Sequence, residues 1–392
     1  MSTTFRRTIK AAPKAVYEML TREHLLPEWF CDTASTNARA DGYYFAGWNT
    51  GDSVSGSFVQ VEPEKSLVLQ IRHRDEPSYG RVEITLEAQG ERTHVTVNHA
   101  DAGPEWHKQW TDGLENLQAV MEVGHDLRIV RRPMLGIMPM ELDAETAAKL
   151  GVPVSKGIKL NGTVPNMGAE KAGLKADDVI VELDGKAITD YQSLPLAIRG
   201  HHAGDSVPVV IYRGAHKHTL ELTFSQRQMP EIPASPESYA ARLEKSYAEL
   251  QSEVEGLFVD VSDGEGGRRP AAKEWSAREV VAHLIVSQRW ILEAIGARIA
   301  GRAAGDLAPN TMQLVEALAS MYSRNAAILA ELKRVRAETV ALVRLIPEEI
   351  AANRANMGYI ALNSGWVTDH DREHFGQIKR TLETVRAAAL AG

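Results

Sequence analysis

The stretch GWVTDHDREHFGQIKR, residues 365–380, decides how the C-terminal part of the chain is interpreted. It contains no proline, and it places His370 and His374 four residues apart, so both imidazoles project from one helical face. A third histidine, His283, lies in another strongly helical stretch, WSAREVVAHLIVSQRW. Such a pair, with one histidine from a facing helix, supplies neutral nitrogens to a divalent metal and leaves coordination positions open. The sequence therefore predicts a metal site formed by His283, His370 and His374.

Composition limits the class of protein. The chain has 392 residues, which suggests roughly two to four domains, and its 44% apolar and 24% charged content is ordinary for a soluble protein. A net charge of −8 without any basic run argues against a nucleic-acid partner. Cys31 is the only cysteine, which excludes an intramolecular disulfide and a thiolate metal cluster. The start lacks a signal-peptide pattern and no apolar run approaches about 18 residues, so we expect a cytoplasmic protein without a membrane span.

Residues 3–124 show the pattern of an antiparallel sheet followed by one long amphipathic helix. A strand and a helix from Pro13 come first, and period-two alternation then predicts the strands SFVQVEPE, SLVLQIRHR, RVEITLEAQ and THVTVNHA. The helix from Pro104 carries apolar residues at 3.6-residue spacing: Trp106, Trp110, Leu114, Leu117 and Met121. His73 and His99 share the parity of the apolar strand positions, so one alternative is that they face the interior as polar anchors; we favour a solvated strand end for them.

This order of elements, with the segments IKAAPKAVYEMLT, PEWF and GLENL, resembles the SRPBCC (START-like, helix-grip) superfamily, in particular the subgroup related to the activator of a heat-shock-protein ATPase. The resemblance implies an α+β helix-grip domain over residues 1–126, with a cavity for an apolar small molecule. Its candidate lining residues are Trp29, Phe58 and Trp110. Our preferred alternative is that these three side chains are packed core.

The middle of the chain resembles a mainly-β PDZ domain of the bacterial HtrA type over residues 133–226. The motifs that carry the resemblance are GAEKAGL at 168–174, DVI at 178–180 and DG at 184–185. Asp177 replaces the glycine that the family usually has before the aspartate, and we expect it to tolerate the left-handed turn there.

The PDZ resemblance implies a peptide-binding groove. A C-terminal peptide is added as a strand, and its carboxylate is held by backbone N–H groups. The carboxylate loop maps to Leu135, Gly136 and Ile137, and the facing helix offers Leu194 and Ile198. The alternative is a degenerate groove or a rigid spacer.

The proline-rich segment SQRQMPEIPASPES, residues 225–238, marks a domain boundary, and the rest of the chain is expected to be helical. Main helices are predicted over 238–256, from Ser276 to about Gly301, over 311–346 as one or two helices, and over 367–389. Ser276 and Glu279 form a predicted capping box. The pattern indicates an all-α four-helix bundle over residues 237–392.

This last region resembles the DinB-like family through the Trp275-Ser276 motif with Glu279 and His283, and the late segment HDREH with Gln377. The resemblance implies that His283, His370 and His374 bind a divalent metal, and that a low-molecular-weight thiol is transferred to an electrophile. Zinc, nickel or iron fits three imidazoles. No catalytic residue is identified; Glu279 and Glu373 are candidates for a general base, with helix capping and a solvated surface as their respective alternatives.

Two functions remain open from the sequence. In the first, the bundle is a metal-dependent thiol transferase, or less favoured a hydrolase, while the START-like and PDZ domains bind an apolar small molecule and a protein C-terminus. In the second, the chain is a non-enzymatic cytoplasmic scaffold or stress sensor for the same two ligands. The fold alone does not decide between them. The oligomeric state also stays open, with a homodimer among the options.

Overall fold

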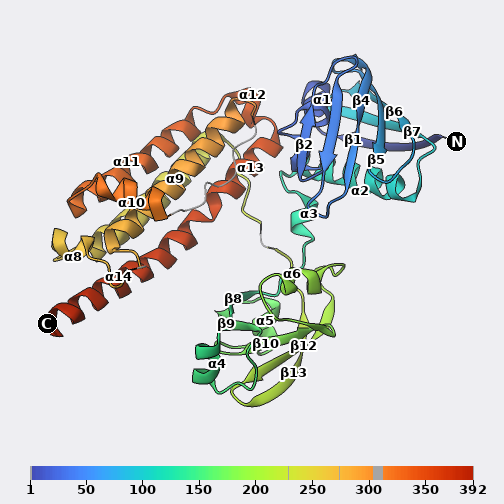
Figure 1. The fold of residues 1–392 in the computed structure, drawn as a ribbon. Helices are drawn as coiled ribbons and strands as arrows, with labels where there is room; N and C mark the ends of the chain where they lie inside the picture. The colour runs from blue at the N-terminus through green and yellow to red at the C-terminus, as the bar shows by residue number, and fades with distance from the viewer. Residues whose placement is uncertain (1, 228, 273, 303–311, 392) are drawn as a thin grey trace. The chain divides into compact units, whose positions relative to one another are not determined.

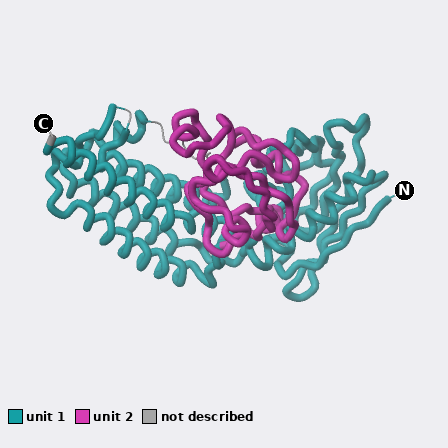
Figure 2. Tube along the Cα trace, turned by 90° about the horizontal axis from the view of Figure 1, so that it is seen from below, with its two compact units in different colours: residues 1–126, 230–392 teal, residues 127–229 magenta. Residues whose placement is uncertain are grey.

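The computed structural model describes residues 2–227, 229–272, 274–302 and 312–391. The chain divides into two compact units (Figure 2). One unit contains residues 1–126 and 230–392, and the other contains residues 127–229. The second unit is therefore inserted, along the sequence, between the two parts of the first.

The N-terminal part of the first unit is a seven-stranded antiparallel sheet with the order β1-β7-β6-β5-β4-β3-β2 (Figure 1). Its elements are β1 (Ser2–Ile9), α1 (Pro13–Thr21), the 3-10 helix η1 (Leu26–Glu28), β2 (Thr33–Thr36), β3 (Tyr43–Gly47), β4 (Ser53–Glu62), β5 (Ser66–His73), β6 (Gly80–Gln89), β7 (Arg92–Ala100) and α2 (Pro104–Glu122). The α+β prediction is confirmed. Strands β2 and β3 were not predicted, because β2 alternates poorly and no residue of it is fully buried.

Helix α2 packs its predicted apolar stripe against the sheet. All five predicted residues of the stripe are buried: Trp106, Trp110, Leu114, Leu117 and Met121. Proline at the first turn of both α1 and α2 fits helix starts where the N–H would have no partner. The helix period read from the sequence therefore gave the buried face correctly.

The expectation that His73 and His99 lie at a solvated strand end was wrong. They are 9% and 1% exposed, because the ring of Trp106 covers both, with ring centroids 4.2 and 4.5 Å away. The Trp110 indole donates to Nδ1 of His99 at 3.0 Å, which places the imidazole proton on Nε2. Burial, the largest cause, lowers the pKa of His99 from 6.5 to about 4.

The second unit contains a six-stranded sheet in which β13-β12-β10-β9-β8 form the main order and β11 pairs with β10. Its elements are α3 (Leu127–Val130), β8 (Ile137–Glu141), α4 (Ala144–Leu150), β9 (Ile158–Thr163), α5 (Gly168–Lys171), β10 (Val179–Leu183), β11 (Lys186–Ala187), α6 (Ser193–Ile198), β12 (Ser206–Arg213) and β13 (His216–Thr223). Asp177 has a φ of 68°, so the left-handed turn predicted for it is confirmed. The neighbouring Asp178 is buried and holds Arg213.

The C-terminal part of the first unit is helical, as predicted. Its helices are α7 (Pro236–Leu257), α8 (Asp263–Gly267), α9 (Ala277–Ile299), α10 (Met312–Ser320), α11 (Asn325–Arg344), α12 (Glu348–Ala351), α13 (Arg354–Gly365) and α14 (Val367–Ala391). The four long ones, α7, α9, α11 and α14, correspond to the predicted helices; Thr311 lies outside the described residues. Helix α13 was not predicted, because no apolar stripe of helical period marks it.

Helix α9 is long and apolar enough to cross a membrane by length and composition alone. Within the protein, 72% of its most apolar window is buried. This is the burial of a central bundle helix, and it agrees with its packing against α10, α11 and α14.

The sheet part and the helical part of the first unit share a packed junction. Ala355 of α13 belongs to the hydrophobic core beneath the sheet. Arg298, at the end of α9, is 3% exposed, pairs with Glu28 and lies 3.7 Å over the Tyr359 ring. A Cβ atom at Gly358 would come within 2.0 Å of the Gly124 carbonyl oxygen, so only glycine allows this approach.

The first prediction concerns pH. The pKa of His99 is lower in the folded state than in the unfolded state, so its stabilising effect is present above pH 6.5 and is lost as the pH falls towards 4. Between these limits wild type is expected to lose roughly 2 kcal/mol more unfolding free energy than His99→Gln. Urea denaturation at both pH values measures the difference. Parallel losses in the two proteins would refute it.

The second prediction concerns the junction. Gly358→Ala forces two backbones apart and is expected to lower the unfolding free energy by about 1–3 kcal/mol. Gly296→Ala is the matched control in α9, where nothing lies within 4 Å of the new Cβ atom. The control should be neutral or stabilising by up to about 1 kcal/mol, since alanine favours a helix. Denaturant midpoints of the full chain test this, and equal midpoints for both variants would contradict the close approach.

Candidate metal centre

The three predicted histidines meet between two helices. Nε2 of His283, from α9, lies 3.1 Å from Nε2 of His370 and 3.0 Å from Nε2 of His374, both from α14. The three ligand atoms all lie within 4.8 Å of one another. His283 is 5% exposed, and the other two are partly buried. The structure therefore brings together side chains that are separated by about ninety residues in sequence.

The local sequence explains where α9 begins. Ser276 accepts a hydrogen bond from the Glu279 N–H, and the Glu279 carboxylate accepts from the Ser276 N–H, which confirms the predicted capping box. Arg269 also donates to both oxygens of this carboxylate. Burial on its own raises the pKa of Glu279, but the hydrogen bonds from Arg269 and Ser276 outweigh it and lower the pKa. These contacts occupy Glu279 as a capping residue.

The other ring nitrogen of each α14 histidine contacts an oxygen. Nδ1 of His370 lies 3.2 Å from the Asp371 carboxylate, and Nδ1 of His374 lies 2.8 Å from the Gln377 amide oxygen. Each oxygen accepts a hydrogen bond from the Nδ1–H group, which leaves the Nε2 lone pair directed into the cluster. Burial is also the largest cause that lowers the pKa of His374, so its ring is neutral near pH 7. This is the protonation state that a metal ligand requires.

These residues fit a divalent metal. One Nε2 atom donates at most one proton, so hydrogen bonding alone does not explain two imidazole nitrogens about 3 Å from the His283 Nε2 atom. A tetrahedral ion with metal–nitrogen bonds of about 2.0–2.1 Å keeps its nitrogen ligands roughly 3.3 Å apart. The two separations from the His283 Nε2 atom, 3.1 and 3.0 Å, are close to this value. Three protein nitrogens leave at least one coordination position for another ligand.

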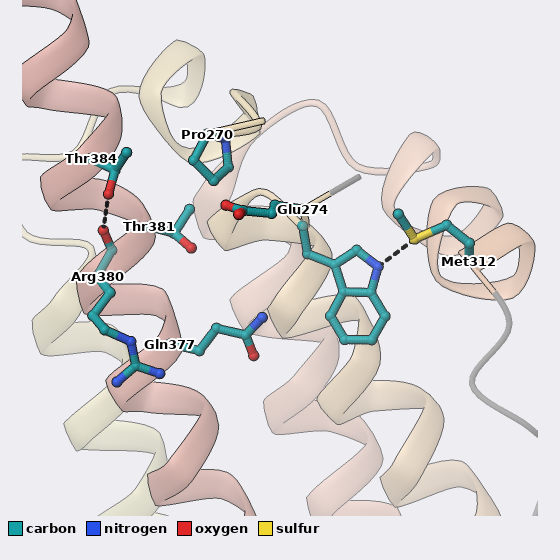
Figure 3. Close-up of a pocket in the computed structure, with 8 residues that line it drawn as sticks. Pro270, Glu274, Met312, Gln377, Arg380, Thr381 and Thr384 are labelled. Atoms are coloured by element: carbon teal, nitrogen blue, oxygen red, sulfur yellow. Dashed lines mark hydrogen bonds between the residues drawn. The ribbon is translucent and has the colours of Figure 1, made fainter. Parts of the chain in front are cut away.

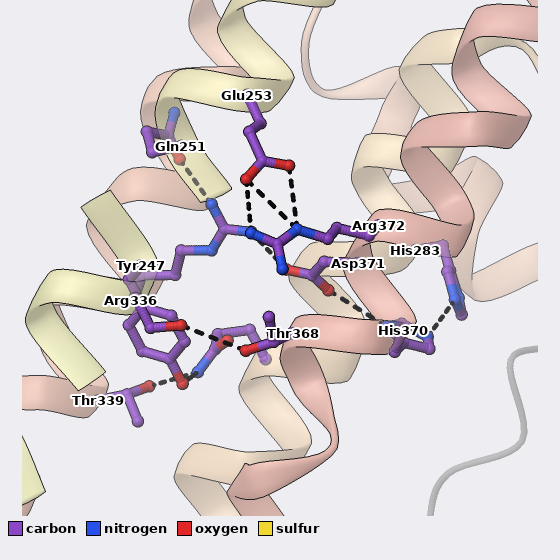
Figure 4. Close-up of polar contacts among 12 residues, drawn as sticks. Tyr247, Gln251, Glu253, His283, Arg336, Thr339, Thr368, His370, Asp371 and Arg372 are labelled. Atoms are coloured by element: carbon purple, nitrogen blue, oxygen red, sulfur yellow. Dashed lines mark hydrogen bonds and ion pairs between the residues drawn. The ribbon is translucent and has the colours of Figure 1, made fainter. Parts of the chain in front are cut away.

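A buried ion pair stands behind His370 (Figure 4). Arg336 of α11 and Asp371 are each 2% exposed, and Arg336 donates to the carboxylate oxygen that does not contact His370. Arg336 also donates to the Gln251 side chain of α7 at 3.0 Å. The chain Gln251–Arg336–Asp371–His370 therefore connects three helices to one ligand and fixes its ring orientation.

A pocket of about 550 Å³ adjoins the histidines (Figure 3). Its lining residues are Pro270, Glu274, Trp275, Met312, Gln377, Arg380, Thr381 and Thr384. Two of them contact the cluster: Gln377 accepts from His374, and the Trp275 ring lies 5.1 Å from the His283 ring. Trp366 packs edge-on against His370, with centroids 4.8 Å apart. The histidines thus have aromatic walls and a polar pocket beside them.

The other candidate residues from the sequence lie elsewhere. Glu373 is exposed on α14. Leu135 and Gly136 are buried in the loop before β8, while Ile137, Leu194 and Ile198 are partly buried around the same core. The candidate cavity residues Trp29, Phe58 and Trp110 are 1%, 0% and 3% exposed and belong to one hydrophobic core. None of these residues lines the pocket beside the histidines or any of three further pockets in the described part of the chain.

Sequence reasoning did not assign roles to Asp371, Gln377 or Arg336. Local spacing offered a signal for the first two, because Asp371 directly follows His370 and Gln377 lies three residues after His374. No local signal marks Arg336, which lies 35 residues before its partner.

Comparison with protein families finds three matches in order along the chain. They are the activator of Hsp90 ATPase homolog 1-like protein over residues 10–122, the PDZ domain over 133–224 and the DinB superfamily over 242–378.

Individual relatives cover only parts of the chain. The periplasmic serine endoprotease DegP of Salmonella typhimurium is 32% identical over 106 residues, which is 27% of this chain and 22% of that protein. The periplasmic pH-dependent serine endoprotease DegQ of Escherichia coli is 30% identical over 98 residues, or 25% and 22% of the two chains. The chain thus spans about a fifth of these relatives.

Two solved structures are similar to a further part. The Aha1 dimer of Colwellia psychrerythraea is 20% identical and covers 32% of this chain and 98% of its own, with a TM-score of 0.29. CalU16 of Micromonospora echinospora is 22% identical and covers 30% and 72%, with a TM-score of 0.27.

The third prediction tests the role of Asp371. Asp371→Asn is expected to weaken divalent-metal binding about 10- to 100-fold, because an amide neither balances Arg336 nor holds the His370 Nδ1 proton as strongly. A competition titration against a chromophoric chelator measures this affinity. Glu373→Gln is the matched control, since it neutralises an exposed carboxylate in the same helix. If both variants bind metal equally well, Asp371 does not position the ligand.

Proposed function

We propose, from a chain that joins an AHSA1-like domain, a PDZ domain and a DinB-superfamily domain in that order, that the helical domain is a divalent-metal-dependent thiol transferase. The observation that carries the proposal is the convergence of three imidazole Nε2 atoms beside a pocket. His283, His370 and His374 hold the metal, and zinc, nickel or iron suits this donor set.

When bound, the metal supplies positive charge that lowers the pKa of a coordinated thiol and makes the sulfur a better nucleophile at neutral pH. The chain's own residues prepare the site. Asp371 and Gln377 hold the Nδ1 protons, so the Nε2 lone pairs face inward. Trp275 and Trp366 cover two of the rings and limit the access of water.

The pocket supports a small charged thiol as the second ligand. Arg380 and Glu274 place opposite charges at its wall, and the hydroxyl groups of Thr381 and Thr384 add hydrogen-bonding groups. Such a wall is complementary to a molecule that carries both an ammonium and a carboxylate group. Trp275 and Met312 supply the apolar part of the lining for the carbon skeleton.

The other two domains supply binding functions in this proposal. The AHSA1-like domain binds an apolar small molecule, and the PDZ domain binds a protein C-terminus through Leu135, Gly136 and Ile137. The N–H groups of Leu135 and Gly136 make no hydrogen bond within the described part of the chain, as a carboxylate-binding loop requires.

That loop also favours the second candidate, a non-enzymatic scaffold or stress sensor for protein C-termini and apolar ligands. In this case the metal is structural and its remaining coordination position is closed. The two candidates differ in whether a small thiol reaches the metal.

The fourth prediction separates them. Full-length protein is expected to bind about one Co²⁺ per chain, with visible bands that shift when glutathione is added. His370→Ala/His374→Ala should abolish both the bands and the metal content. His216→Ala/His218→Ala is the matched control, since it removes two exposed histidines from another part of the chain. Elemental analysis and absorption spectra give the readout. Absorption bands that do not shift when glutathione is added would favour the scaffold function. Metal retained by the His370→Ala/His374→Ala variant would refute the proposed metal site.

A further inference from the structure

The edge of the PDZ sheet is defined by strand β8, which pairs with β9 on one side only. The carbonyl of Gly136 accepts from Val164 at 2.8 Å, and the N–H of Leu142 donates to Gly157 at 3.1 Å. Even-numbered positions therefore face β9. Met138 pairs with Gly162 and Pro139 with Leu160. One residue of β9 between these two pairs therefore has no opposite residue in β8, so the extra residue of the irregularity lies in β9. The alternation along β8 is thus unbroken, and odd-numbered positions face the free edge.

The free edge has its backbone groups at Ile137, Pro139 and Glu141. Proline has no N–H, so position 139 donates nothing to an added strand. Its carbonyl is also engaged, because the Tyr191 hydroxyl donates to it at 3.0 Å. The Glu141 carboxylate in turn accepts from the Tyr191 N–H at 3.0 Å. Both contacts come from the segment just before α6, and the one from the hydroxyl occupies the carbonyl that a ladder pair at position 139 would use.

The other half remains able to receive a chain end. Gly136 has a φ of 80°, and a Cβ atom there would lie 2.3 Å from Met167, so the loop geometry depends on glycine. The Leu135 and Gly136 N–H groups make no hydrogen bond within the described residues. Leu194 and Ile198 of α6 lie against the core and keep part of their apolar surface exposed.

From this arrangement we propose that the groove recognises a free C-terminal carboxylate and its last two residues only, with an apolar final side chain. The inference rests on the proposed peptide-binding function of the PDZ domain. Hydrogen-bonded pairs in an antiparallel ladder recur at every second residue. A peptide residue bound at Ile137 therefore needs Pro139 for its next pair, but Pro139 has no N–H and its carbonyl already accepts from the Tyr191 hydroxyl. Residues further upstream leave the groove, and Pro139 and Tyr191 determine this length limit.

The test uses the full-length protein and N-acetylated peptides of three and seven residues that share the ending Ala-Ala-Val. Isothermal titration calorimetry measures their dissociation constants. Wild type is expected to bind both peptides within about threefold of each other, because no ladder bond forms beyond Ile137. The amidated tripeptide should not bind measurably, since its carboxylate is gone.

The restoring variant is Pro139→Ala/Tyr191→Phe, which supplies an N–H and frees a carbonyl at one position. It is expected to bind the long peptide about ten- to thirtyfold more tightly than wild type, as two hydrogen bonds are gained. Its affinity for the dipeptide Ala-Val, which does not reach position 139, should be unchanged, and this result also shows that the groove is intact. Tyr79→Phe is the matched control, because Tyr79 is likewise an exposed tyrosine, at 53%.

Three results overturn the inference in distinguishable ways. A wild-type protein that gains more than about tenfold from three to seven residues has a full-length groove, while peptide binding itself stands. A double variant without any gain for the long peptide shows that Pro139 and Tyr191 do not set the limit. If no peptide of either length binds to wild type or variant, the proposed peptide function fails, and the inference fails with it.

Discussion

The helical domain depends on one buried ion pair, Arg336 with Asp371. Two charges that are each 2% exposed are tolerated only when they compensate one another. The pair joins α11 to α14, and Gln251 extends it to α7. It fixes the rotation of α14 about its own axis. Since Asp371 points towards Arg336, His370 and His374 of the same helix are turned towards α9, which carries His283. The convergence of the three histidines therefore depends on the same orientation of α14 that buries the Arg336–Asp371 pair.

This dependence explains what the sequence revealed and what it did not. His370 and His374 were recognisable because an i,i+4 pair shares a helical face, and His283 because it lies in a strongly apolar helix. Their roles followed from short-range periodicity. Arg336 was not recognisable, because its partner is 35 residues away and a lone arginine in an amphipathic helix is ordinary. Long-range polar contacts leave no periodic trace, so the three histidines could be singled out from the sequence, whereas Arg336 could not.

In the sheet domain, the burial of two histidines could not be predicted from the sequence. Alternation placed His73 and His99 on the buried parity, but composition suggested a solvated end for them. The structure resolves the conflict through Trp106 and Trp110, which cover both rings and satisfy one imidazole nitrogen. A buried histidine is costly only without a partner. The tryptophans were predicted as a helix stripe, yet the hydrogen bond that the Trp110 indole donates to His99 can be recognised only when the helix and the sheet are placed together.

In the PDZ domain, too, the contacts at the free edge of β8 could not be recognised from the sequence. Pro139 and Tyr191 look unremarkable in sequence, since proline is common at sheet edges and the tyrosine precedes a short helix. Their effect depends on which side of β8 each residue faces. If the irregular residue were in β8 instead of β9, Pro139 would face β9 and the free edge would be open. With the observed register, one missing donor and one occupied acceptor fall at the same position of the free edge. This is the position where a strand added to the groove needs its second hydrogen-bonded pair.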